Sequence, residues 1–254
     1  MQLSELVSRY DDRLRTADYA AFDASANGLQ VGPEDKEVTT VAFGVDAAVS
    51  TIEAAARADA DVFVVHHGLS WGGFDRVTGS TYERIRLLVE NDIALYVSHL
   101  PLDGHEELGN AAGIADVLEL ENCERFGAEA TEYIGVRGTA PEPFSVTDLR
   151  EELVGLDNGG QRVQVLEHGP AEIEDIGIIT GSGTDWIPEA EATGVDALIT
   201  GEGKQQAYHN SKEAGIHVFL AGHYATETFG VRALQQLAEE WGLETTFIGE
   251  PTGL

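Results

Sequence analysis

The sequence predicts an α/β protein built from two interlinked α/β lobes with mainly parallel sheets. Short apolar runs rich in β-branched residues alternate with helical patterns along most of the 254 residues, and this alternation is typical of strand–helix–strand units. A different pattern occupies the middle of the chain, and the first one then resumes. We therefore expect a first lobe over 1–125 and 196–254 and a second lobe over 126–195.

The first lobe begins with an amphipathic helix over 1–14, whose apolar residues recur at helical spacing. Apolar runs then predict strands over 38–45, 61–67 and 93–99, and helical patterns predict helices over 47–58, 80–91 and 108–120. In the second lobe we expect a strand, a helix and two further strands over 133–140, 146–155, 162–169 and 175–183. Strands over 196–202, 217–223 and 244–250 complete the first lobe, with a long helix over 224–241.

The chain is strongly acidic, with 45 Asp and Glu against 15 Lys and Arg and a net charge of −30. Such a field repels phosphate backbones and anionic lipid surfaces, which argues against nucleic-acid and membrane partners. We interpret the acid excess and the scarcity of lysine as halophilic adaptation to a cytosol with molar salt, where charge repulsion is screened. An acidic mesophilic protein is the alternative.

The sequence shows neither a targeting segment nor a pattern of several cysteines. No apolar run approaches the ~18 residues of a membrane-spanning helix, and the N-terminus lacks the pattern of a signal peptide, so we expect a cytoplasmic protein. The single cysteine, Cys123, excludes an intramolecular disulfide and a cysteine-rich zinc site.

Three of the predicted strands end in histidine. His66 and His67 follow VFVV, His99 follows ALYVS, and His223 follows VFLAG. Because ligands of open parallel sheets bind outside the carboxyl ends of the strands, these side chains converge on one crevice if the strands are neighbours. A single histidine in such a place is more often a core or solvated residue, but three repeats of the placement weaken that interpretation.

A carboxylate follows two of these histidines at a spacing of four residues. Asp103 follows His99, and Glu227 follows His223. On a helix, such positions share one face, so one ion can contact both side chains. Glu227 is expected in the first helical turn after His223, whereas Pro101 places Asp103 in a loop. For an isolated pair with this spacing, a surface ion pair is the better interpretation.

The candidate ligands together combine imidazole with carboxylate groups: His66, His67, His99, Asp103, His223 and Glu227. These donors suit Zn²⁺, Fe²⁺, Mn²⁺ or Ni²⁺ and disfavour Ca²⁺ and Mg²⁺. One tetrahedral zinc uses about four ligands, so six candidates indicate two ions, which can share a carboxylate.

Five motifs resemble those of the Nif-three-like dinuclear metal proteins: GLQVG (28–32), VVHHGLSW (64–71), SHLPLD (98–103), TGE (200–202) and AGHYATE (221–227). They occur in the family's order from Asn27 onward. Bacterial members of the family carry the name GTP cyclohydrolase type-2 homologue. One departure is that the family usually has Asp-Asn before the GL turn, where this chain reads Ser25-Ala26-Asn27.

The resemblance implies a role for each candidate residue and an assembly. His67 and Asp103 would bind one ion, His66 and His223 the other, Glu227 would bridge the two, and His99 would be a catalytic residue that moves protons. The implied cofactors are two divalent metal ions per subunit. The implied fold is the Nif-three-like one, and the implied partner is the chain itself, in a homohexameric toroid built as a trimer of dimers.

The leading functional hypothesis is a metal-dependent, GTP cyclohydrolase-like hydrolase that acts on a small heterocyclic or phosphorylated molecule. The chain has no P-loop, and Arg76, Arg137 and Lys204 are the only basic residues that we can place near such a crevice. A metal storage or delivery protein without turnover would use the same ligands. A ring-shaped scaffold that encloses a partner is a third interpretation, and the residues leave the three open.

Overall fold

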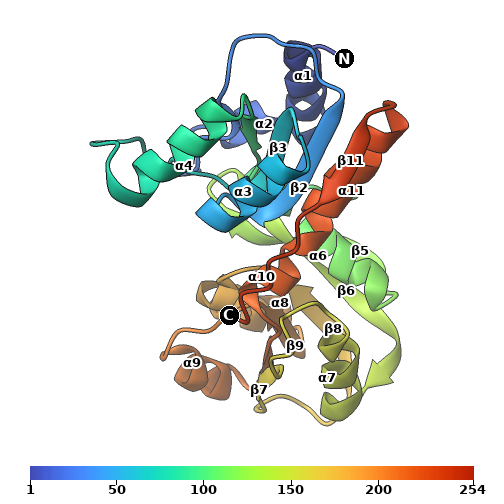
Figure 1. Cartoon of the computed structure of the whole chain (residues 1–254). Coiled ribbons are helices and arrows are strands. Elements are labelled where there is room, and N and C mark those ends of the chain that lie inside the picture. The colour runs from blue at the N-terminus through green and yellow to red at the C-terminus, as the bar shows by residue number, and fades with distance from the viewer. The chain divides into compact units, whose positions relative to one another are not determined.

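A computed structural model describes residues 1–254, and the chain forms two compact units (Figure 1). Unit 1 comprises Met1–Leu102 and Gly230–Glu250, and unit 2 comprises Asp103–Phe229 and Pro251–Leu254. The chain passes between the units three times, and each unit has its own sheet. The expected α/β organisation as two interlinked lobes is confirmed.

Unit 1 is built on a five-stranded sheet of order β1-β4-β3-β2-β11. Its strands are β1 (Gly28–Val31), β2 (Thr40–Asp46), β3 (Val62–His67), β4 (Ala94–Val97) and β11 (Glu244–Phe247). All neighbours are parallel except β1, which runs antiparallel to β4. The helices are α1 (Leu3–Leu14), α2 (Thr16–Tyr19), α3 (Val49–Arg57), α4 (Gly79–Glu90) and, from Gly230 onward, α11 (Thr228–Glu240).

The core of unit 1 explains why these segments become strands. Val62–Val65 of β3 are completely buried, as are all four residues of β4, because a parallel strand is covered on both faces. Ile52 of α3 and Leu88 of α4 pack in the same cluster as Phe63. This core places the carboxyl ends of β3 and β4 side by side.

Unit 2 contains a six-stranded sheet of order β5-β6-β8-β9-β10-β7. Its strands are β5 (Glu121–Glu129), β6 (Glu132–Phe144), β7 (Gln164–Leu166), β8 (Ile173–Ile178), β9 (Ala197–Thr200) and β10 (His217–Leu220). Only β8, β9 and β10 run parallel, whereas the other pairings are antiparallel. The expectation of mainly parallel sheets therefore holds for unit 1, and the sheet of unit 2 is mixed.

Short helices connect the strands of unit 2. They are α6 (Asn110–Val117), α7 (Val146–Val154), the 3₁₀ helix η1 (Gly183–Trp186), α8 (Ile187–Thr193), α9 (Ala207–Ala214) and α10 (His223–Thr226). The helix α5 (Leu100–Asp103) spans the boundary between the units. None of the helices in the protein combines the length and apolar character needed to cross a membrane.

Several elements were not expected from the sequence, among them β1, α2 and α8, and two further differences have a clear local cause. The strand β5 was not expected, because most of its residues are exposed and show no alternation of apolar and polar side chains. The helix expected over 224–241 is interrupted, since α10 ends at Thr226 and α11 begins at Thr228.

The two units also divide the chain elsewhere than the expected lobe boundaries. The expected first lobe includes 196–229, but β9 and β10 pair with β8 in the sheet of unit 2. Unit 2 accordingly extends from Asp103 to Phe229. The expected boundaries differ from the observed ones because the apolar pattern of a sequence does not show which strands are hydrogen-bonded to each other.

Candidate metal centre

Unit 1 brings three of the predicted histidines together. His66 and His67 end β3, and His99 follows the neighbouring strand β4. One ring nitrogen of each lies within 4.8 Å of the others. The ring of His66 lies 4.6 Å from that of His67, centre to centre, and 5.1 Å from that of His99. The alternation of side chains along β3 therefore does not separate the two adjacent histidines at its end.

The Nδ1 atom of each histidine in this cluster faces an oxygen acceptor at 2.9 Å. The acceptors are the Ser98 carbonyl for His66, the Asp46 carboxylate for His67 and the Asp23 carboxylate for His99. When Nδ1 donates to such an oxygen, the lone pair of the ring is on Nε2, and this arrangement is typical of metal-binding histidines. The cluster is thus oriented to offer imidazole ligands.

Asp23 is a site residue that the sequence did not predict. Its side chain is 1% exposed, and besides His99 it accepts hydrogen bonds from Asn27 Nδ2 and the Ser25 and Leu100 amides. Burial raises the pKa of Asp23, but the hydrogen bond and charge of His99, together with the hydrogen bonds from Asn27 and the Ser25 amide, outweigh it and lower that pKa overall. Although this chain has Ser25-Ala26-Asn27 where the family usually has Asp-Asn, Asp23 therefore supplies a carboxylate beside the site. The spacing Asp23-x-Ser25, typical of an Asx turn, is the local signal that could have revealed it.

Unit 2 supplies the remaining three predicted residues. Nε2 of His223 lies 3.2 Å from Oε1 of Glu227, and its Nδ1 lies 3.0 Å from Oε1 of Glu202. Asp103 accepts hydrogen bonds from Asn110 Nδ2 at 2.8 Å and Thr180 Oγ1 at 3.0 Å. The His223–Glu227 spacing in the sequence thus corresponds to a direct contact.

Two buried carboxylates lie close together in unit 2. Asp103 is 7% and Glu227 3% exposed, and an oxygen of one lies within 4.8 Å of an oxygen of the other. Two negative charges so close and so buried repel each other and are poorly solvated, so a cation stabilises them. This pair is the feature that most directly favours metal binding.

The electrostatics of His223 follow from its two carboxylate neighbours. Burial by itself lowers the pKa of His223, but the hydrogen bonds and charges of Glu227 and Glu202 outweigh it and raise the pKa to about 9. The two carboxylates thus favour a positive charge at this imidazole.

Two glycines allow the loops of unit 2 to approach the histidine and the carboxylate. Gly181 has a φ of +61°, and a Cβ there would lie 2.3 Å from Oε1 of Glu227. A Cβ on Gly201 would lie 2.6 Å from the Cα of His223. The short motifs GSG and TGE, which on their own indicate only a turn, thus contain residues whose lack of a side chain the site requires.

The position of Asp103 corrects one local expectation. Asp103 is the last residue of α5 and does not lie in a loop. Pro101 is the second residue of this helix, where an amide proton has no partner within the helix, so proline is compatible with the first turn.

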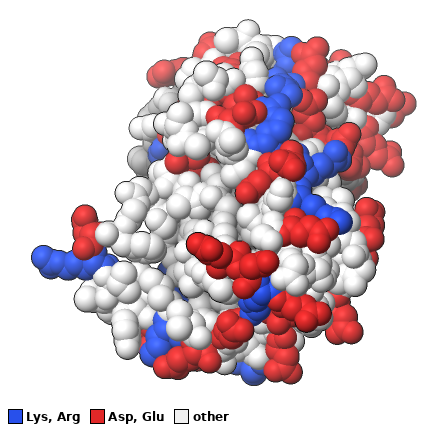
Figure 2. All heavy atoms as spheres, turned by 90° about the horizontal axis from the view of Figure 1, so that it is seen from above, with Lys and Arg blue, Asp and Glu red and all other residues white.

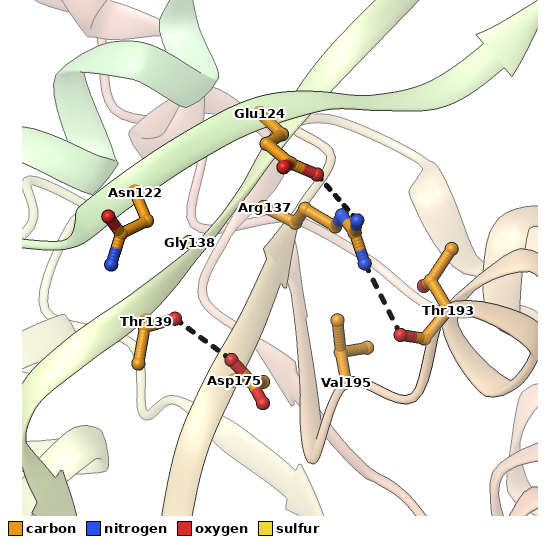
Figure 3. Close-up of a pocket in the computed structure, with 8 residues that line it drawn as sticks. All are labelled: Asn122, Glu124, Arg137, Gly138, Thr139, Asp175, Thr193 and Val195. Carbon is orange, nitrogen blue, oxygen red and sulfur yellow. Dashed lines mark hydrogen bonds and ion pairs between the residues drawn. The ribbon is translucent and has the colours of Figure 1, made fainter.

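A separate hollow of unit 2 is shown in Figure 3. It has a volume of about 190 Å³ and lies beside β6 and β8. Arg137 binds Glu124 and the Thr193 carbonyl, and Thr139 donates to Asp175. Because these polar groups bind one another, the hollow gives no sign of a ligand, and Arg137 is engaged in an ion pair.

Comparison with known proteins identifies the family. A model described as Duf34/NIF3 (NGG1p interacting factor 3) matches residues 1–252. The chain belongs to the Duf34/NIF3 family. Halobacterium salinarum has a relative of this NIF3 protein that is named GTP cyclohydrolase 1 type 2 homolog. It is 58% identical to this chain over the full length of both chains. A relative of the same name from Deinococcus radiodurans is 41% identical, over 98% of this chain and 94% of its own.

Solved structures agree with this assignment. The protein TTHA1606 from Thermus thermophilus covers the whole of both chains, with a TM-score of 0.90 and 35% identity. Reduced HcgD from Methanocaldococcus jannaschii has a TM-score of 0.85 over 98% of each chain, but at 23% identity it shows a shared fold alone. The family to which the sequence motifs pointed is confirmed.

Proposed function

We propose that this NIF3 protein binds two divalent metal ions and is a metal-dependent hydrolase of a small heterocyclic or phosphorylated molecule. The proposed ligands are His67 and Asp103 for one ion, His66 and His223 for the other, and Glu227 as a bridge between them. The proposed set combines three imidazoles with two carboxylates. The closely spaced, buried Asp103–Glu227 pair carries the proposal.

The chemistry of the donors fits such ions. Imidazoles held through Nδ1, together with carboxylates, suit Zn²⁺, Fe²⁺, Mn²⁺ or Ni²⁺. When bound, divalent ions supply Lewis acidity to a water and to the substrate. The surrounding acid-rich chain, with a net charge of −30, attracts cations to the site.

His99 is the proposed catalytic residue, which accepts and returns a proton. Asp23 holds its Nδ1 atom, and the Asn27 side chain accepts the His99 amide at 2.7 Å. These contacts fix the ring and leave Nε2 for the proton. The Asp23 carboxylate also stabilises the imidazolium that forms when His99 takes up this proton.

Metal content tests the binding part of the proposal. We expect about two divalent ions per purified chain by elemental analysis, and clearly fewer after His67→Ala or Glu227→Ala. His209→Ala, at an exposed position of α9, is the matched control and retains the metal. Unchanged metal in both ligand variants would contradict the proposal.

Turnover tests the hydrolase part. Metal-loaded protein is incubated with GTP and a panel of cyclic nucleotides and amides, and products are separated by chromatography. We expect His99→Ala to retain its metal and to lose activity by about 100-fold, which is typical for the loss of a general acid–base group. Metal that exchanges rapidly, without turnover of any compound in the panel, would instead favour storage or delivery.

A further inference from the structure

Trp71 lies beside the histidine cluster of unit 1 and is largely exposed. Its ring centre is 4.9 Å from that of His99, with the two planes at 80°, and 5.9 Å from that of His67. Nevertheless 46% of Trp71 is accessible to solvent. A large apolar side chain at the rim of a polar site is a frequent feature of ligand pockets.

The backbone fixes Trp71 in this place. Segment 70–72 pairs with segment 24–26 through two hydrogen bonds, from the Ala26 amide to the Ser70 carbonyl and from the Gly72 amide to the Ala24 carbonyl. Ser25 and Trp71 form an antiparallel bridge between them. The same short segment is preceded by Asp23, which orients His99. The main chain of Trp71 is therefore fixed, and the ring contacts with His67 and His99 place the indole before any ligand arrives, which lowers the entropy cost of binding.

We propose that Trp71 recognises a planar heteroaromatic ring of the substrate by stacking, an inference that rests on the hydrolase function proposed above. Aromatic side chains bind flat rings face to face without requiring a charge. A ring of purine size stacked on the indole lies next to the imidazoles of His67 and His99, whose ring centres are within 6 Å of the indole.

The charge of the chain makes recognition through a ring more favourable than recognition through phosphate. The net charge of −30 repels anions at a distance, whereas stacking is insensitive to it. Of the three basic residues considered for phosphate, Arg137 and Lys204 are already paired with Glu124 and Asp185, and only Arg76 forms no ion pair. The substrate class that follows is a small molecule with a flat heterocycle.

The binding of guanosine, which carries a heteroaromatic base without phosphate, tests this inference, and ribose serves as the probe that lacks the base. Affinities are measured by calorimetry for the purified protein and for Trp71→Phe, Trp71→Leu and Phe74→Leu. Phe74 is the control, because it lies in the same loop and is similarly exposed at 44%. Quenching of tryptophan fluorescence, compared between the wild type and Trp71→Phe, reports directly on the indole.

We expect guanosine to bind and ribose not to bind. Trp71→Leu should weaken the binding of guanosine by about tenfold or more, which is within the range measured for the loss of base stacking. Trp71→Phe and Phe74→Leu should retain most of the affinity. Equal affinity in wild type and Trp71→Leu, or no guanosine binding at all, would overturn the inference. Elemental analysis of the same samples separates the two proposals, since a lack of metal contradicts the metal-dependent function and does not affect the dependence on Trp71.

Discussion

At the scale of single residues, the candidate site depends on acceptors that hold the histidines. Asp46, Asp23 and Glu202 each accept from a different ring. None of them lies near its histidine in the sequence, so a histidine and its partner are joined only in the folded units. The carboxylates orient each ring and make its Nε2 more basic, which strengthens a metal ligand or a proton carrier.

Asp23→Asn tests this role at His99. An amide can present its NH₂ group to Nδ1 and stabilise the wrong tautomer, so we expect turnover to fall by about 10- to 100-fold while metal content stays unchanged. Asp18→Asn is the control, because Asp18 is an exposed partner of Arg15. Steady-state kinetics and elemental analysis check the result, and an equal loss in both variants would argue against a specific role.

The raised pKa of His223 predicts how metal affinity depends on pH. A protonated imidazole cannot bind an ion, so an ion must displace the proton from His223, whose pKa is about 9. We expect affinity to rise with pH up to about 9, beyond the ordinary histidine value of 6.5. Metal titrations by calorimetry at several pH values check this, and an affinity that stays level above about pH 7 would contradict it.

The same shift affects the stability of the metal-free protein. The folded-state pKa of His223 lies above the ordinary value of 6.5, so the protonated form stabilises the fold. This contribution is complete below about pH 6.5 and is lost as the pH rises through about 9. Glu202→Gln should reduce it, because one of the two carboxylates that raise the pKa is removed.

At the scale of elements, loops with glycine bring the proposed ligands of unit 2 together. Gly181 follows Thr180, which binds Asp103, and its amide donates to Thr226 Oγ1 just before Glu227. The break between α10 and α11 falls at Glu227. A continuous helical pattern in the sequence thus conceals the turn from which this carboxylate projects.

Gly181→Ala, compared with Gly194→Ala, tests whether the site needs the close approach of the Gly181 loop to Glu227 or whether only backbone strain matters. Gly181 and Gly194 both have positive φ, of +61° and +76°, but only Gly181 has neighbours that a Cβ would meet. We expect each alanine variant to lose about 1 kcal/mol of stability from the left-handed backbone, and Gly181→Ala alone to lose metal. Thermal unfolding and elemental analysis measure the two effects, and retained metal in Gly181→Ala would refute the need for close approach.

At the scale of the whole molecule, acidic side chains outnumber basic ones by 45 to 15. On the face drawn in Figure 2, Asp and Glu atoms are widespread, and the Lys and Arg atoms mostly lie beside them. The chain forms exposed ion pairs such as Arg9–Glu5 and Arg15–Asp18, and each contributes little to stability. The remaining acids repel one another, which explains the expectation of an environment rich in salt.

Salt should therefore stabilise the protein. Raising KCl from about 0.1 M to about 1 M shortens the Debye length from ~10 Å to ~3 Å, which screens repulsion among charges that sum to −30. We expect the unfolding temperature to rise steadily over this range. An unfolding temperature that falls or does not change, measured by calorimetry, would favour the acidic mesophilic alternative.

We propose that the chain assembles into the homohexamer that its resemblance implies. Light scattering coupled to size-exclusion chromatography in molar salt should then give six times the mass of one chain. Because low salt leaves acidic subunits unscreened, we expect smaller species there. A monomer at every salt concentration would contradict the proposal.

The sequence alone determined the α/β class, the family and the residue types at the strand ends, because apolar periodicity and short motifs are local properties. It did not predict β5, whose exposed side chains have no apolar period, nor the mixed sheet of unit 2, which depends on pairing between distant strands. Tertiary structure alone decided that Asp23, Asp46 and Glu202 hold the histidines, and that Trp71 lies beside His99. The physical reason is that hydrogen-bond partners and ring contacts depend on strand register and loop packing, and these arise from contacts between segments far apart in the chain.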